Sequence, residues 1–452
     1  MSNYTRRDFI RRSATGAAGL GLILNGEWVR LEASQLPNPA GPNDRVNMGF
    51  IGFGIRGNIL LESAKQTGQA NLVAACDCYQ GHLDRAKERT DGKIDTLLAQ
   101  YKKLLDRKDI DAVAIATPDH WHLPMVLDAL DAGKDVYIEK PMTHRIEDGP
   151  KMIDAARRAK RIVQAGSQWV SSDQHKKAKE IVASGKLGKV TKVTATYNRN
   201  SSTGAWNYPI PLDLQKGVNF NWEEWLGPAP QVAYDPERVF RYRKYWDYSG
   251  GISTDLFVHL INSIHFIMGV QMPRAVVACG GILFRHDGRE VPDTLDAMFD
   301  YDGFCVNMAS TFNSASTAGQ GIQFLGTDGS LTLLLGGAMT TLAESKAEGY
   351  GYSIDSWPKK MQDDFMSQGN HKTESEGALP RPQPEDVPFE SKPDATVLHL
   401  AEFFNAVRSR TPSYETAEVG HHSAAAGHMV NLSYRSGKKM VWDNGSGTAK
   451  EA

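Results

Sequence analysis

The stretch VNMGFIGFGIRGN, residues 46–58, decides the fold of this chain. Apolar residues dominate over 46–51, which predicts a strand, and the pattern from 58 to 67 predicts a helix. Between them, Gly52, Gly54 and Gly57 have the spacing G-x-G-x-x-G, and a second strand is expected at 71–76. This order of strand, glycine loop, helix and strand is typical of a dinucleotide-binding βαβ unit.

The residues around this loop suit a nicotinamide dinucleotide. The three glycines allow a tight turn and bring backbone N–H groups at the helix start close to a pyrophosphate. Asp77 follows the second strand, where a carboxylate accepts a hydrogen bond from the ribose 2′-hydroxyl. Because the same charge repels a 2′-phosphate, we expect NAD rather than NADP. A glycine turn in a sheet that binds no ligand is the alternative.

The rest of the chain predicts two α/β units. In the first, strands alternate with helical patterns, which indicates a doubly wound parallel sheet; strands are expected at 112–116, 135–138 and 163–165, and helices at 123–132 and 146–160. From residue 190 the strands are half polar with hairpin-like spacing, which indicates a mainly antiparallel sheet; they are expected at 190–197, 275–284, 294–301, 305–312 and 322–326. A helix over 253–268 interrupts them.

We therefore expect four segments. Residues 1–43 are a signal and linker, 44–168 a dinucleotide-binding domain, 169–394 a substrate-binding domain, and 395–452 closing helices and a tail. Within the third segment, about 336–393 is expected to form an extended insert, because it has no sustained hydrophobic period and many polar, Gly and Pro residues.

The first residues indicate export. A basic stretch around Arg6 and Arg7 precedes an apolar run at 14–24 that is too short to cross a bilayer. The arginine pair after a hydroxyl residue resembles the twin-arginine signal, which is read by a receptor and carried by proteins that cross the membrane folded. We expect the twin-arginine export machinery as a partner and a periplasmic or other extracytoplasmic location. An ordinary basic amphipathic tail is the alternative.

Composition narrows the classes of protein. With 41% hydrophobic and 23% charged residues in 452, the chain can bury a large core, which excludes a disordered protein. A formal charge of −2 gives no electrostatic basis for binding nucleic acid. Four cysteines are too few for a disulfide framework, so we expect free core thiols at Cys76, Cys78, Cys279 and Cys305. No Cys/His zinc spacing occurs, and we expect no metal site.

Three segments carry candidate chemistry. Residues 117–122 (TPDHWH) and 139–141 (EKP) follow predicted parallel strands and so lie at the crevice where such sheets bind ligands. In the second unit, Asp255 and His259 stand one helical turn apart, just after Gly250-Gly251. A carboxylate there orients a histidine base. By spacing alone, an ion pair on a helix surface is the commoner outcome, and half of a metal site is a further alternative.

These motifs in this order resemble the Gfo/Idh/MocA family of nicotinamide-dependent sugar oxidoreductases. The resemblance covers about residues 46–336 and rests on the glycine loop, Asp77, 117–122, Gly133-Lys134, 139–141, 222–228 and 250–259. It implies an α/β fold with an N-terminal Rossmann domain and a C-terminal domain built on an open, mainly antiparallel sheet. In the family this sheet holds substrate over the nicotinamide and often forms a subunit interface, so we expect a homo-oligomer.

The resemblance also implies roles for single residues. Lys140 is the catalytic lysine, Asp255 its partner, and His259 the acid/base that takes a proton from a sugar hydroxyl. The residues implied to contact the cofactor are Gly52, Gly54, Ile55, Arg56, Gly57, Asp77, Thr117, Pro118, His122, Glu139, Lys140 and Gln168. The chain departs from the family at Asn262, where an aspartate is common, and at Gln168, where many relatives have a nearby arginine.

The expected substrate is a sugar or glycoside hydroxyl. Trp206, Tyr208, Arg243 and Trp246 precede the catalytic helix and offer aromatic faces and donors that suit a pyranose ring. Because an exported protein finds little NAD outside the cell, the cofactor is expected to stay bound and to be recycled on the enzyme. One alternative is a redox-neutral, NAD-dependent glycoside hydrolase that works by transient oxidation and elimination. Another is a non-enzymatic sugar- or cofactor-binding protein.

Overall fold

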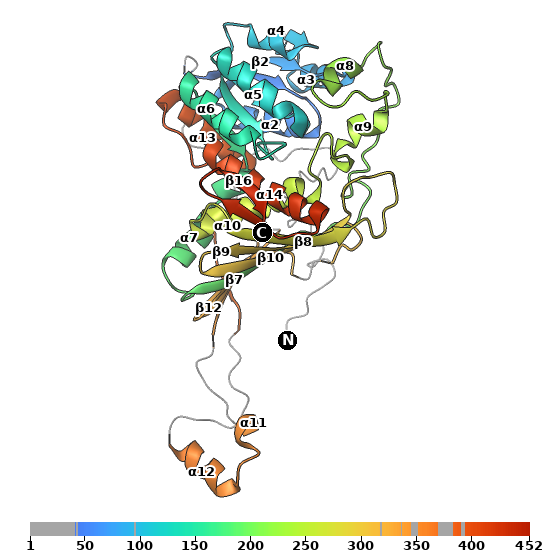
Figure 1. Cartoon of the computed structure of the whole chain (residues 1–452). Helices are drawn as coiled ribbons and strands as arrows, with labels where there is room; N and C mark the ends of the chain where they lie inside the picture. Colours follow the sequence, from blue (N-terminus) through green and yellow to red (C-terminus); the bar gives the residue numbers. More distant parts are fainter. Residues whose placement is uncertain are drawn as a thin grey trace, which may run out of the picture.

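The computed structural model describes residues 41, 44–94, 96–316, 319–335, 337–344, 351–368, 383–389 and 394–452. The predicted twin-arginine signal lies outside the described residues. Figure 1 shows two domains, the first with its sheet and helices at the top and the second built on a sheet below it.

Six parallel strands form the first sheet in the order β3-β2-β1-β4-β5-β6, which confirms the predicted doubly wound sheet. The strands are β1 Val46–Ile51, β2 Ala70–Cys76, β3 Thr96–Leu98, β4 Ala112–Ile115, β5 Asp135–Glu139 and β6 Val163–Gly166. The strand order reverses between β1 and β4, beside the glycine loop. This reversal is where open α/β sheets form their ligand crevice.

Helices cover both faces of this sheet, with a hydrophobic cluster under each layer. They are α2 Ile55–Thr67, α3 Gln80–Arg89, α4 Tyr101–Leu105, α5 His122–Asp131 and α6 Asp148–Ala159, with 3₁₀ turns η2 Asp119–Trp121 and η3 Gln168–Ser171. Because α2 begins at Ile55, three residues before the predicted start, the last part of the glycine loop is itself the first turn of the helix.

Ten strands form the second sheet in the order β14-β13-β12-β11-β7-β10-β9-β8-β15-β16. Only β7 and β10 pair in parallel, so the sheet is mainly antiparallel as expected. Its central strands are β7 Val190–Thr196, β8 Ala275–Gly281, β9 Thr294–Tyr301, β10 Phe304–Thr311, β11 Gly321–Gly326 and β12 Gly329–Leu334.

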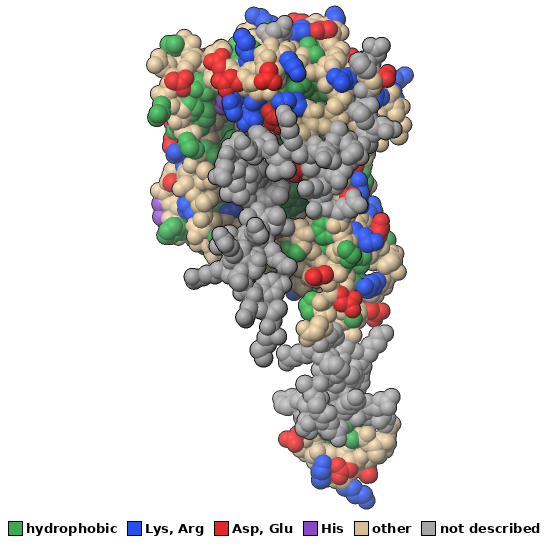
Figure 2. Space-filling view, turned by 180° about the vertical axis from the view of Figure 1, so that it is seen from behind, with side chains coloured by type: hydrophobic (Ala, Val, Ile, Leu, Met, Phe, Trp, Pro, Cys, Tyr) green, Lys and Arg blue, Asp and Glu red, His purple; other side chains and the backbone are tan. Residues whose placement is uncertain are grey.

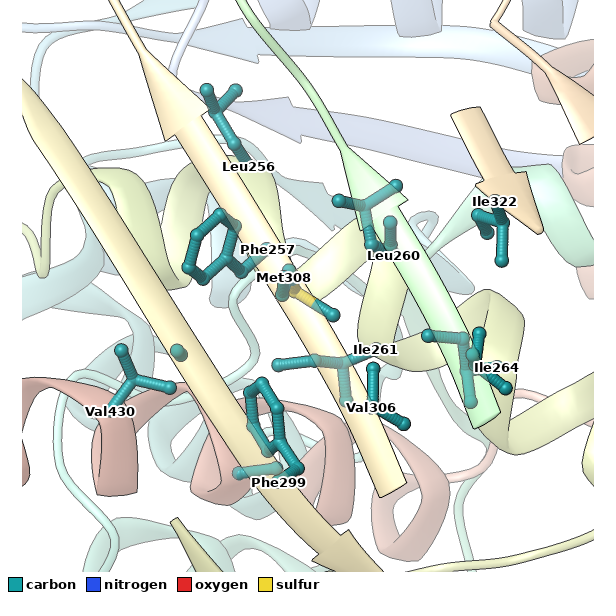
Figure 3. Close-up of a cluster of buried hydrophobic side chains, with 14 of the residues drawn as sticks. Leu256, Phe257, Leu260, Ile261, Ile264, Phe299, Val306, Met308, Ile322 and Val430 are labelled. Carbon is teal, nitrogen blue, oxygen red and sulfur yellow. The ribbon is translucent and has the colours of Figure 1, made fainter. Parts of the chain in front are cut away.

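Helices pack on one face of the second sheet and leave the strands' alternate residues on the other face more exposed. They are α7 Asp173–Ala183, the π-helical turn η5 Ser253–Phe257, α10 Val258–Met268 and α14 Ala417–Ser436. Figure 3 shows Phe257 and Ile261 from η5 and α10 facing Phe299 and Met308 from the strands. The predicted helix over 253–268 thus begins with a wide π turn, which contains Asp255.

A long, mostly irregular segment between β7 and η5 joins the two domains. It contains the short helices α8 Trp222–Leu226 and α9 Pro236–Phe240 and the 3₁₀ turn η4 Tyr242–Lys244. Its aromatic side chains form a hydrophobic cluster with Tyr79, which follows β2 of the first domain.

Two expected segments contain strands of the second sheet. Within the expected insert at about 336–393, β13 Met339–Ala343 and β14 Glu385–Asp386 join that sheet. Figure 1 shows α11 Gly351–Ile354 and α12 Lys359–Ser367 apart from both domains. The expected closing helices of residues 395–452 are present as α13 Ala395–Ser409 and α14 Ala417–Ser436. The first packs against α2, and the tail forms β15 Met440–Asp443 and β16 Thr448–Glu451, which extend the second sheet. These packing partners lie too far away in the sequence for local patterns to reveal.

All four cysteines are free, but the expectation of core thiols is wrong for Cys279. Cys279 is exposed because alternate residues of β8 point away from the helices, whereas Cys76 is buried.

The surface of the first domain carries charges of both signs. Figure 2 shows its basic and acidic side chains intermixed in the view from behind. Among the described residues, no helix has the length and apolar character needed to cross a membrane.

Candidate active site

The glycine loop lies at the carboxyl edge of the first sheet. Gly52 has a φ of +84°, and a Cβ there would lie 2.7 Å from the backbone oxygen of Ala116. A Cβ on Gly57 would lie 2.2 Å from the backbone oxygen of Gly52, whereas the nearest atom to a Cβ on Gly54 is 3.9 Å away. The first and third glycines therefore allow the turn, and the second leaves the backbone open to a ligand.

Asp77 lies directly beside this loop. Its Oδ2 accepts a hydrogen bond from Phe53 N at 2.6 Å, and its Oδ1 accepts one from Tyr79 N at 2.9 Å and lies 3.1 Å from His82 Nδ1. Burial opposes ionisation, but His82 and the two N–H donors outweigh it and lower the pKa of Asp77. The carboxylate is therefore ionised and held in place where the sequence predicts a ribose contact.

Both ring nitrogens of His122 lie within hydrogen-bond distance of backbone oxygens of its own domain. Its side chain is buried, with Nδ1 2.8 Å from the backbone oxygen of Pro141 and Nε2 3.1 Å from that of Thr117. It joins the loops that follow β4 and β5. Thr117 Oγ1, by contrast, is buried without a hydrogen-bond partner among the described residues, and Pro118 immediately precedes η2.

The remaining predicted cofactor residues line the same edge. Arg56 Nε pairs with Glu139 Oε1 at 2.6 Å, and its Nη2 has no partner in the described structure. Ile55 is 61% exposed at the start of α2. Gln168 is buried after β6, and its Oε1 also lacks a partner in this part of the chain. Unpaired polar atoms, an open Gly54 and an ionised Asp77 together fit a dinucleotide along this edge.

Lys140, after β5, meets the second domain at Asp255. Lys140 Nζ lies 2.8 Å from Asp255 Oδ1 and 2.8 Å from its backbone oxygen. The same carboxylate accepts hydrogen bonds from Arg243 Nε at 2.9 Å and from Trp206 Nε1 at 3.1 Å. Although burial opposes its charge, Lys140 and Arg243 hold the pKa of Asp255 well below its usual range.

His259 lies one turn further along the same helix. Its ring stacks on Trp169 with centroids 4.7 Å apart, and its Nδ1 is buried without a hydrogen-bond partner in the described residues. Burial first, and then the positive charge of Lys140, lower the pKa of His259 well below its usual value. The imidazole is therefore neutral at physiological pH and able to accept a proton.

The predicted substrate residues differ in burial and in their contacts. Trp206 is fully buried and bonded to Asp255, so the structure assigns it to positioning that carboxylate rather than to stacking on a sugar. Arg243 also bonds Asp255. Tyr208 is half-buried. Trp246 is half-buried and its Nε1 donates to the backbone oxygen of Glu290 at 3.1 Å.

Three residues near this cluster are absent from the sequence-based site. Trp169 stacks on His259. Asp119 is buried with Oδ2 unpartnered in the described chain; burial raises its pKa to about 6, and Arg243, Asp255 and Lys140 are among the charges acting on it. The positive charge of Arg199, which follows β7, also lowers the pKa of Asp255. The motif TPDHWH contained Asp119, but nothing local distinguished Trp169 or Arg199.

Residues 213–222, which we term the strap, cross from the second domain onto the end of β2. Gln80 N donates to the backbone oxygen of Asn219 at 2.8 Å, and Asn221 N donates to that of Cys78 at 3.0 Å. The Tyr79 hydroxyl donates to Asp213 Oδ1 at 2.5 Å. The strap therefore fastens the second domain to the residues that directly follow Asp77.

Two family models match this chain. Residues 46–167 match a model described as oxidoreductase family, NAD-binding Rossmann fold. Residues 171–278 match one described as oxidoreductase family, C-terminal alpha/beta domain. The two matches follow one another and contain the glycine loop, Lys140, Asp255 and His259.

Curated relatives and solved structures resemble different lengths of the chain. A glycosyl hydrolase family 109 protein of Shewanella baltica is 34% identical over 186 residues, and an alpha-N-acetylgalactosaminidase of Shewanella oneidensis 32% over 179. Each match spans 36% of this chain and 39% of the relative. The aldose-aldose oxidoreductase of Caulobacter crescentus has a TM-score of 0.64 at 17% identity over 88% of this chain and 99% of its own. The structure of a levoglucosan dehydrogenase in complex with NADH and levoglucosan has a TM-score of 0.64 at 16% sequence identity, and the match covers 87% of this chain and 98% of the dehydrogenase.

Proposed function

Because this chain belongs to the Gfo/Idh/MocA family of oxidoreductases, we propose that it oxidises a hydroxyl group of a sugar or glycoside with tightly bound NAD. The observation that carries the proposal is the cluster of Lys140, Asp255 and His259 beside the cofactor edge of the first sheet. When bound, the nicotinamide supplies the acceptor for a hydride. The chain itself must bind the substrate and move its hydroxyl proton.

His259 is the neutral imidazole of the cluster and the group to which we assign acceptance of that proton. Its imidazole is neutral because burial and the nearby Lys140 disfavour a second positive charge. Lys140 Nζ is held by Asp255 and provides hydrogen-bond donors that stabilise an oxygen as it loses its proton. Asp255 is held in turn by Arg243 and Trp206, so it stays ionised and keeps Lys140 in place.

The preference for NAD over NADP rests on Asp77. An ionised carboxylate at this point accepts from a ribose 2′-hydroxyl and repels a 2′-phosphate. His82 lies 3.1 Å from Asp77, and the carboxylate raises the pKa of His82 against the effect of burial. When protonated, His82 reduces the repulsion, so we infer that discrimination against NADP weakens as pH falls.

Retention of the cofactor is supported by the strap. It bonds Cys78, Tyr79 and Gln80, which follow Asp77 and so border the adenosine end of a bound dinucleotide. Release of the cofactor then requires these bonds to open. This arrangement suits an enzyme exported in folded form by the twin-arginine route to an extracytoplasmic location, where free NAD is scarce.

Redox-neutral glycoside hydrolysis is the second candidate. The glycosyl hydrolase family 109 proteins favour it, because their sequence identity to this chain exceeds that of the solved sugar oxidoreductases. Those matches span 39% of the relatives, so the substrate of the relatives does not carry over to this chain as a whole.

We also propose a homo-oligomer formed through the second sheet. Val277 and Met298, on β8 and β9, are 49% and 57% exposed on the face away from the helices. An apolar sheet face of this kind is stabilised when a second copy covers it.

One experiment tests the proposed function. Mass spectrometry of the purified protein identifies bound nucleotide, and a panel of sugars and glycosides is then assayed for both reduction of NAD and release of free sugar. Reduction of NAD without sugar release supports the oxidoreductase, and sugar release without net NADH supports the hydrolase. Protein that binds no nicotinamide dinucleotide and turns over no carbohydrate would refute both.

A further inference from the structure

Arg199 has an unusual environment for a half-buried arginine. Its backbone N donates to the backbone oxygen of Thr311 at 2.9 Å, which holds it beside β10. Its Nη2 donates to the Tyr197 hydroxyl at 3.0 Å, and its guanidinium carbon lies 4.7 Å from the centre of the Tyr197 ring. Its Nε is buried without a hydrogen-bond partner, and no carboxylate pairs with it among the described residues.

Several neighbouring arginines of the second domain are paired with carboxylates. Arg238 lies 3.4 Å from Asp247, Arg289 lies 2.8 Å from Asp287, and Arg241 pairs with Glu237. Arg285 pairs with no carboxylate of the described chain, but its guanidinium donates to the backbone oxygen of Phe312 and to Asn200 Oδ1, whereas Nε of Arg199 is buried without a partner. A cationic donor left in this state is costly unless an acceptor compensates it.

A row of aromatic rings connects Arg199 to the catalytic histidine. Tyr197, beneath the guanidinium, lies 6.0 Å from Trp169, which stacks on His259 at 4.7 Å. The charge of Arg199 is also near enough to lower the pKa of both Asp255 and His259. Arg199 therefore borders the site from the second domain, whereas Lys140 borders it from the first.

Asp255 does not complete the pairing of Arg199. Its two carboxylate oxygens already accept from Lys140, Arg243 and Trp206. The residues of the cluster with formal charge are three cations, Lys140, Arg199 and Arg243, and two carboxylates, Asp119 and Asp255. The formal charges of these five residues therefore sum to one positive charge in excess.

We propose that the substrate carries a carboxylate and that Arg199 binds it, so that the enzyme acts on a sugar of the uronic acid class. This inference rests on the proposed function and names its substrate class. A planar guanidinium presents several donors to a carboxylate, and charge-assisted hydrogen bonds of this kind are strong in a site shielded from water.

The test measures equilibrium binding to the NADH-loaded enzyme through the fluorescence of the nucleotide. D-glucuronate is compared with D-glucose, and D-galacturonate with D-galactose. The wild type is expected to bind at least one uronate about tenfold or more tightly than its neutral counterpart. R199M should weaken uronate binding about 10- to 100-fold and change binding of the neutral sugar less than about threefold. R199K keeps the charge but loses the planar guanidinium, so its affinity for the uronate should lie between those of the wild type and R199M.

R241M is the matched control, because Arg241 is already paired with Glu237 and its loss should not separate acidic from neutral sugars. Equal binding of both members of each pair by the wild type would overturn the inference, and so would equal weakening of both by R199M. The wild-type comparison stands even if R199M fails to fold. Turnover of neutral sugars alone would overturn the uronate assignment and leave the proposed function intact, whereas absence of nucleotide and turnover would refute the function itself.

Discussion

Lys140 Nζ lies 2.8 Å from Asp255 Oδ1 although the two residues are 115 positions apart and belong to different domains. The contact means that the proton-transfer groups come together only when the second domain is docked on the first. It also explains why Asp255 remains ionised despite burial, because Lys140 and Arg243 both stabilise its charge.

Lys140→Ala and His259→Ala are each expected to lower turnover by about 10²- to 10⁴-fold, the usual contribution of a positioned acid, base or oxyanion donor. The fold should survive in Lys140→Ala, because Asp255 keeps its bonds to Arg243 and Trp206. The measurement is kcat on the best substrate, with bound NAD and the melting temperature as controls. Turnover near the wild-type rate in either variant would show that the assigned role is wrong.

Asp77→Ala should relax the preference for NAD over NADP by about one to two orders of magnitude, equivalent to about 1.4–2.8 kcal/mol. The variant loses both the ribose hydrogen bond and the repulsion of a 2′-phosphate. The ratio of the two dissociation constants is measured on nucleotide-stripped protein. Asp111→Ala, at the opposite edge of the sheet, is the control and should leave the ratio unchanged.

Tyr79→Phe should speed the release of NAD about tenfold, because it removes the hydroxyl bond between the first domain and Asp213 of the strap. Tyr101→Phe is the matched control, since the Tyr101 hydroxyl donates to Asp128 Oδ2 at 2.6 Å within the first domain alone. Release is followed by displacement of bound NADH with excess NAD. Identical release rates in the two variants would mean that the strap does not retain the cofactor.

Glu415→Gln should change how stability depends on pH. Glu415 is buried and accepts from Asn262 Nδ2 at 3.0 and 3.2 Å, and burial raises its pKa to about 8. Between the ordinary carboxyl pKa and about 8, the folded protein keeps a proton that the unfolded chain has lost, so this group's stabilisation falls as pH rises.

The loss amounts to at most about 1.4 kcal/mol per pH unit for one such group. The melting temperature between pH 5.5 and 8.5 should therefore fall more steeply in the wild type than in Glu415→Gln. Glu180→Gln, at an exposed carboxylate that pairs with Lys177, is the control and should follow the wild type. Parallel curves for wild type and Glu415→Gln would contradict this prediction.

Replacing Arg6 and Arg7 with lysine should keep active protein in the cytoplasm if the twin-arginine expectation is right. Lysine preserves the charge but not the arginine pair that the export receptor recognises. Activity and bound NAD are compared between cytoplasmic and exported fractions. Normal export of the double variant would refute the expectation, and loss of activity from both fractions would show that the change acts on the enzyme instead.

The local features of the first domain could be predicted from the sequence because they depend on residues close together in the chain. Buried strands, the glycine turn and a carboxylate at the end of β2 each leave a short pattern at 46–77. The same holds for Asp255 and His259, whose spacing on one helix follows from the helical period. Their roles required the family resemblance as well.

Only the tertiary structure decided what these residues contact. Trp206 suggested a sugar platform but is fully buried behind Asp255, and His122 suggested a ligand contact but joins two loops. Arg199 had no local signal, because its lack of a carboxylate partner depends on strands and loops distant in the sequence. Local periodicity reports which side of an element is buried, whereas the pairing of charges across a domain boundary depends on how the two sheets dock, and no short stretch of sequence contains that information.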